Sequence, residues 1–123
     1  MTNENKKVYD LEKRTIKLSE EIIAFLRGIK RDNINLPLIS QLVRSATSVG
    51  ANYFEANGAS SKKDFRNKIY ICKKESKESA YWIQLIAKAN PDKEDECRKL
   101  WKEAHELTLI FSKIAATASK NEN

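Results

Sequence analysis

Apolar residues recur along the chain at alternating steps of four and three, a spacing that places them on one face of an α-helix. The first stripe of this kind consists of Leu11, Thr15, Leu18, Ile22, Phe25 and Ile29. It predicts a helix over about residues 10–31, and Asp10 is in position to cap its N-terminus. Ile16, Ile23 and Leu26 widen the stripe, so we expect this helix to face two neighbours rather than one.

Three more amphipathic segments follow, and they predict helices over about residues 36–57, 61–89 and 92–118. Pro37 suits the first turn of the second helix, because its missing N–H would be unpaired there. The expected inward positions are Ile39, Leu42, Val43, Ala46, Val49, Tyr53, Phe65, Ile69, Cys72, Ser76, Ala80, Ile83, Ile86, Ala87, Cys97, Leu100, Trp101, Ala104, Leu107, Thr108, Phe111, Ile114, Ala115 and Ala118. The pattern predicts an all-α fold, an antiparallel up-down-up-down four-helix bundle that forms one domain over residues 1–123.

A helical hairpin is expected around residues 57–61. Asn57-Gly58 is a pair able to enter the left-handed region that ends many helices, and Ser61 with Asp64 resembles a capping box. In an antiparallel hairpin about this turn, residues whose numbers sum to about 118 lie level. The resulting pairs are Arg44 with Glu75, and Glu55 with Lys62, Lys63 or Arg66.

Net charge adds a candidate function. The chain carries +6 at pH 7, and residues 60–90 hold eight basic residues against three acidic ones, whereas residues 91–123 hold six against seven. Basic surfaces of this kind bind the phosphates of nucleic acids. The candidate phosphate-binding residues are Arg44, Lys62, Lys63, Arg66, Lys73, Lys74 and Lys77. Two alternatives remain open: a solvated lysine-rich face, and polar pairs that fix the register of the hairpin.

Chemistry at a catalytic or metal centre finds little support. Cys72 and Cys97 lack CxxC spacing, so we expect two buried free thiols, as in a cytoplasmic protein, rather than a zinc site or a disulfide. His105 is the only histidine, and no nucleophile–base pattern or phosphate-binding glycine loop accompanies it. We therefore expect no catalytic residues, no metal and no cofactor. No segment approaches the roughly 18 apolar residues of a membrane span, so no membrane contact is expected.

Aromatic residues suggest self-association. Tyr53, Phe54, Tyr70, Tyr81 and Trp82, together with the wide apolar stripes, exceed what a slender bundle is expected to bury. The last three side chains can serve for base stacking or for contact between subunits, and the subunit interface is the preferred interpretation. A homo-oligomer is therefore expected.

A family resemblance rests on the second and third helices. Its elements are Gln41 and Arg44, then Ser48 with Asn52 and Glu55, and the helix start Ser61-Lys62-Lys63-Asp64-Phe65. In these residues the chain resembles the 23S rRNA intervening-sequence proteins, also known as S23 ribosomal proteins. It departs from many of them at Ala56, where they have Gly after the Glu, and the chain reaches Gly58 two residues later.

The resemblance implies a small antiparallel bundle similar to proteins that assemble as pentameric rings. The chain is also similar to accessory proteins of diversity-generating retroelements, which partner a reverse transcriptase and bind nucleic acid. Gln41, Asn52, Glu55, Ser61 and Asp64 are then structural residues of the family motif. The leading hypothesis is a non-enzymatic homo-oligomer, pentameric by resemblance, that binds RNA or DNA. The alternative is a scaffold that docks a protein partner such as a polymerase.

Overall fold

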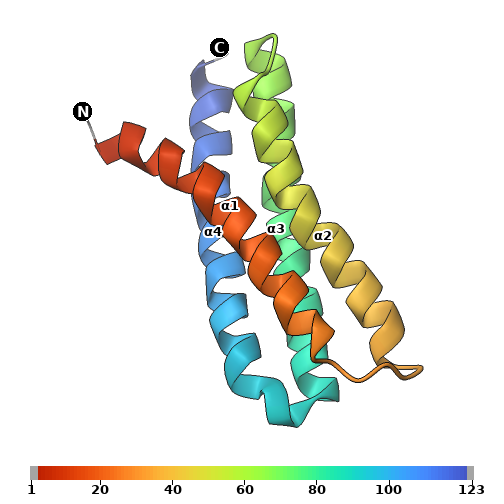
Figure 1. Ribbon diagram of the computed structural model, residues 1–123. Helices are drawn as coiled ribbons and strands as arrows, with labels where there is room; N and C mark the ends of the chain where they lie inside the picture. Colours follow the sequence, from red (N-terminus) through yellow and green to blue (C-terminus); the bar gives the residue numbers. More distant parts are fainter. Residues whose placement is uncertain (1–2, 122–123) are drawn as a thin grey trace.

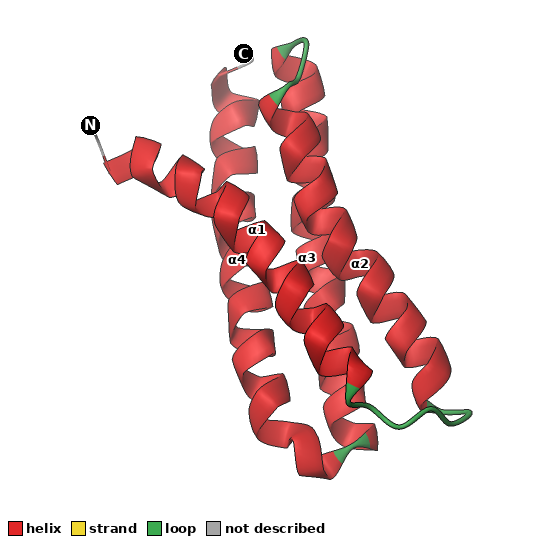
Figure 2. Ribbon diagram, in the orientation of Figure 1, coloured by secondary structure: helices red, strands yellow, loops and turns green. Residues whose placement is uncertain are grey.

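Four long helices run alternately up and down (Figure 1). The computed structural model describes residues 3–121. It comprises α1 (Asn3–Arg27), α2 (Asn35–Asn57), α3 (Lys62–Ala89) and α4 (Glu94–Asn121), with a short 3-10 helix η1 (Pro91–Lys93) before α4. No strand occurs in this part of the chain (Figure 2). The predicted all-α antiparallel bundle is confirmed.

Helix α1 differs from its predicted bounds at both ends. It begins at Asn3 rather than near residue 10, so Asp10 lies inside the helix and is not its cap. It ends at Arg27 rather than near residue 31. The turn that follows uses shorter i,i+3 bonds, and the guanidinium of Arg31 folds back to donate to the carbonyl of Leu26 at 2.8 Å. A side chain therefore satisfies helix-end acceptors that a longer helix would have used.

Helix α2 begins one residue earlier than predicted, with Pro37 in its first turn. The carboxylate of Asp32 organises this start, because it accepts hydrogen bonds from the backbone N–H groups of Ile34 at 3.0 Å and Asn35 at 2.7 Å. Asn35 is itself buried, and its side-chain amide exchanges two hydrogen bonds with the amide of Asn90, at 3.1 and 2.9 Å. This pair ties the α1–α2 connection to the end of α3.

The turn between α2 and α3 confirms one prediction and corrects another. Ser61 caps α3 by accepting from the N–H of Asp64 at 3.0 Å, and the carboxylate of Asp64 accepts from the N–H of Ser60 at 3.3 Å. The expected left-handed Asn57-Gly58 pair is wrong: Gly58 has φ −103° and ψ 16°, and no residue of the described chain has a positive φ. The helix closes instead by tight bonds, with Gly58 N–H donating to Glu55 at 3.1 Å.

Helix α4 starts at Glu94 rather than near residue 92, because Pro91, Asp92 and Lys93 form the 3-10 turn, and it runs to Asn121 rather than 118. Three acidic residues occupy its first turn, Glu94, Asp95 and Glu96. Their negative charges interact favourably with the positive end of the helix dipole.

The core lies along the inner faces of all four helices. Every position of the first predicted stripe is buried. The predicted inward positions of the other helices are buried or packed against the core, except Thr108 and Ala118, which are partly exposed. Tyr53 belongs to this core, with a 3% exposed side chain whose ring lies 5.8 Å from that of Phe111. It therefore adds nothing to the exposed aromatic surface, contrary to expectation. Ile16 and Ile23 of α1 remain 53% and 40% exposed.

Helix α1 lies across α2 and α4, on the side of the bundle away from α3 (Figure 1). Arg14 joins it to α4 through two hydrogen bonds to Glu103, at 3.0 and 2.7 Å. Hydrogen bonding to this carboxylate raises the pKa of Arg14. Because the guanidinium binds both carboxylate oxygens, the pair fixes the position of α1 along α4. The outer face of α3 is thus free of α1.

Candidate nucleic-acid interface

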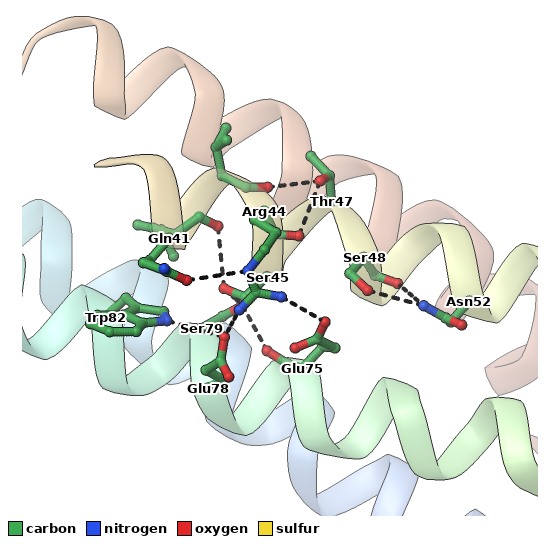
Figure 3. A network of polar contacts seen from close by, with 12 residues as sticks. Gln41, Arg44, Ser45, Thr47, Ser48, Asn52, Glu75, Glu78, Ser79 and Trp82 are labelled. Atoms are coloured by element: carbon green, nitrogen blue, oxygen red, sulfur yellow. Dashed lines mark hydrogen bonds and ion pairs between the residues drawn. The ribbon is translucent and has the colours of Figure 1, made fainter. Parts of the chain in front are cut away.

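A polar network joins α2 to α3 (Figure 3). At its centre the hydroxyls of Ser45 and Ser79, both buried, lie 2.9 Å apart, and Ser79 also donates to the carbonyl of Glu75 at 2.8 Å. Small side chains at these positions let the two helices approach closely, and their hydroxyls find partners without water. Ser45 thus provides a direct contact between α2 and α3.

Arg44 lies at the edge of this network, between two carboxylates of α3 (Figure 3). One guanidinium nitrogen is 3.0 Å from Oε2 of Glu75, and another pairs with Glu78. The pairing of residues 44 and 75 predicted from the antiparallel register is confirmed. Gln41 also accepts from Nε of Arg44 at 3.2 Å. With its donors so engaged, Arg44 is better placed to fix the register of the hairpin than to meet a phosphate.

The Arg44–Glu75 pair matters for stability because the Glu75 carboxylate is buried. Its side chain is 8% exposed, and its second carboxylate oxygen, Oε1, has no hydrogen-bond partner among the described residues. A buried carboxylate in this position depends on the neighbouring cation, since transfer of a charge from water carries a large free-energy cost.

Glu55 pairs with a lysine that the level-residue prediction did not include. Its carboxylate lies 3.0 Å from Nζ of Lys68. The long lysine side chain reaches about one helical turn along the hairpin, which a level-residue rule leaves out. Hydrogen bonding to Glu55 raises the pKa of Lys68. Asn52 bonds within its own helix, donating to the carbonyl and hydroxyl of Ser48 at 2.9 and 3.0 Å.

The outward face of α3 carries one exposed row, the α3 stripe, whose residues follow helical spacing. It consists of Lys63, Asn67, Tyr70, Lys74, Lys77, Tyr81, Gln84 and Lys88, all exposed. No acidic residue belongs to it, because Glu75 and Glu78 turn toward α2. Three of the predicted phosphate-binding residues, Lys63, Lys74 and Lys77, lie on this row. Lys62, at the exposed start of the helix, and the half-buried Arg66 and Lys73 flank it.

A second basic row on α4, the α4 stripe, lies beside the first. It consists of Arg98, Lys102, His105, Leu109, Lys113, Ala116 and Lys120, all exposed. Two hydrogen bonds join the helices on this side: Tyr70 with Ser119 at 3.2 Å and Thr108 with Ser76 at 3.0 Å. Residues 91–123 are slightly acidic when their charges are summed, so a charge count along the chain misses this row, because it ignores which helix face each residue occupies.

The remaining chemical candidates are the two cysteines and His105. Burial raises the pKa of the Cys72 thiol to about 12 and that of Cys97 to about 11, so both predicted buried thiols stay protonated. The imidazole of His105 stacks on Trp101, with ring centroids 4.8 Å apart. Within the described residues no group of His, Cys, Asp and Glu side chains could hold a metal ion, and no helix has the length and apolar character that a membrane crossing requires.

A family model for the 23S rRNA-intervening sequence protein matches residues 7–120. The chain belongs to this family. A similar solved structure is that of a protein with unknown function from the S23 ribosomal protein family of Bacteroides thetaiotaomicron. It superposes with a TM-score of 0.81 at 24% identity, over 89% of this chain and 98% of that one, and shows the same fold. Comparison with curated proteins gives no match.

Membership of the 23S rRNA-intervening sequence protein family agrees with the resemblance seen in the sequence. In this protein the motif residues make contacts within the hairpin. Gln41 contacts Arg44, Asn52 bonds to Ser48, and Glu55 pairs with Lys68. Ser61 and Asp64 build the start of α3. Of the residues in the two exposed basic rows, Lys63 alone also belongs to this motif.

Proposed function

We propose that this protein is a non-enzymatic, homo-oligomeric bundle that binds RNA or DNA through the phosphates, using the basic surface formed by the α3 and α4 stripes. The observation that carries the proposal is the sorting of charge on α3. Basic residues occupy the exposed row, whereas Glu75 and Glu78 are turned inward against Arg44. The α3 stripe therefore presents positive charge with no interspersed carboxylate, and such a row attracts a polyanion, whose counterions are released on binding.

Charge reversal tests this surface. In the triple variant K63E/K74E/K77E, binding of a 20-nucleotide oligomer should be lost at low salt. Single Lys→Gln changes should each lower the slope of log K against log salt by about 1. All three lysines are exposed, and Lys63 lies in the first turn of α3, where a negative charge is favoured by the helix dipole. Loss of binding would therefore not reflect loss of the fold.

The chain offers a matched control. Lys13, Lys17 and Lys30 are exposed on α1 or just after it, and α1 lies away from α3. The variant K13E/K17E/K30E changes net charge by the same amount. Among the described residues it breaks one ion pair, the exposed Lys17–Glu21 pair, which contributes little. Binding that falls equally in both variants would show attraction to net charge alone. Salt-insensitive binding, or none at low salt, would refute the proposal and leave the protein-docking scaffold, tested by copurification after nuclease treatment.

Self-association has its own support. An apolar groove between α1 and α2 is lined by Ile16, Ile23, Ala51 and Phe54, among others, and Phe54 is 73% exposed. We propose that a second copy of the chain covers this groove, and a pentameric ring is the stoichiometry that the family resemblance favours. Repeated basic surfaces would then bind one polyanion through avidity.

Light scattering measures this assembly. The wild type should exceed the monomer mass of 14.1 kDa, and I16E/F54E should reduce it to that mass while the helical circular dichroism persists. A wild-type monomer at micromolar concentration would refute both oligomer and avidity, whereas a dimer would refute only the ring.

A further inference from the structure

Two half-exposed tyrosine rings lie among the lysines of the α3 stripe. Tyr70 is 45% and Tyr81 54% exposed, and Lys74 and Lys77 lie between them on the same row. Resting on the proposed function, and in place of the subunit contact preferred from the sequence, we propose that Tyr70 and Tyr81 stack on unpaired bases, so that the basic surface selects single-stranded RNA or DNA over duplex. Flat rings beside cations are the combination by which proteins hold single strands.

Each ring is held in place by a contact at its edge. The hydroxyl of Tyr70 lies 3.2 Å from that of Ser119 on α4, and the ring of Tyr81 lies 5.0 Å from that of Trp82 at an interplanar angle of 70°. Trp82 is in turn anchored by donating to Glu78 at 3.2 Å. Rings positioned in advance lose less conformational freedom on stacking than free ones.

The spacing along α3 suits a strand that follows the helix. Tyr81 follows Tyr70 by eleven positions, which is about 16.5 Å of helix rise. Lys74 and Lys77 fill this interval with positive charge, so phosphates between two stacked bases meet cations. In a duplex the base faces are covered by their neighbours, and only the phosphates remain available to this surface. The lysines therefore bind the phosphates of both forms of nucleic acid, whereas the tyrosines bind only the exposed bases of a single strand.

The test uses three probes with comparable backbones: (dT)20, an abasic 20-unit phosphodiester, and a 20-base-pair duplex, each measured by fluorescence anisotropy. Wild type should bind (dT)20 at least about tenfold more tightly than the abasic strand, the scale of one stacked base. Y70L/Y81L should bind both single strands equally and keep its duplex affinity. Y70F/Y81F, which retains the rings, should keep the preference.

Each outcome separates this inference from the proposed function. Equal wild-type affinity for (dT)20 and the abasic strand overturns the stacking role and leaves phosphate binding intact. A preference for (dT)20 that survives in Y70L/Y81L overturns the assignment to these two rings. Failure of the wild type to bind any probe at low salt overturns the proposed function itself.

Discussion

Removal of the Arg44 side chain should show whether this residue stabilises the fold or binds phosphate. In Arg44→Ala the carboxylate of Glu75, 8% exposed, loses its cation while its Oε1 already lacks a partner. Removal of one partner from a fully buried pair costs about 3–5 kcal/mol. Since the Arg44 side chain is 49% exposed, water can reach the vacated site, and we expect about 2 kcal/mol.

Urea unfolding followed by circular dichroism, at one fixed protein concentration, measures this loss. At the m-value of a small domain, about 2 kcal/mol corresponds to a midpoint shift of about 1 M. Arg98→Ala is the control, because Arg98 makes only exposed pairs with Glu94 and Asp95, and it should cost under about 0.5 kcal/mol. The double variant R44M/E75L should recover most of the loss. A midpoint for Arg44→Ala no lower than that of Arg98→Ala would refute the reasoning.

The same variant distinguishes the two roles considered for Arg44. Where the fold is retained at low urea, a residue that only fixes the hairpin register should leave the slope of log K against log salt unchanged. A phosphate ligand should lower that slope by about 1. Because Arg44 is already paired with Glu75 and Glu78, we expect the unchanged slope.

Other consequences of the structure are equally direct. Asn35→Ala should lower the free energy of unfolding by about 2 kcal/mol in thermal melts, because it leaves the amide of Asn90 short of a partner; an unchanged midpoint would contradict this. The raised pKa values of Cys72 and Cys97, about 12 and 11, mean that the unfolded thiols ionise first. Their stabilising contribution is therefore present below pH 9 and lost as pH rises toward 12, and C72A/C97A should flatten this decline. Gly58→Ala should leave stability unchanged or raise it by a few tenths of a kcal/mol, because Gly58 has a negative φ and its nearest carbonyl would lie 3.9 Å from the new Cβ. A marked loss of stability would instead indicate that Gly58 adopts the left-handed conformation.

Hydrophobic spacing alone determined the four helices and nearly all of the core, because burial of one helical face is a local, periodic property of the sequence. The antiparallel register was also readable, since the short turn before Ser61 brings Arg44 level with Glu75. Helix ends were less accessible. Arg31 and the 3-10 turn at Pro91 move them by satisfying backbone groups through contacts that periodicity does not describe.

Tertiary structure decided which charges are available to a ligand. Glu55 reaches Lys68, Arg44 is held by two carboxylates, and Arg14 is held by α4. These ion pairs depend on how each helix is rotated about its axis and shifted along it relative to its neighbours. A charge count along the chain does not contain this information. The α4 stripe shows the same limit, because a charge count does not record which face of α4 each basic residue occupies. Sequence thus determined the helices and the core, and packing determined the surface that a polyanion would meet.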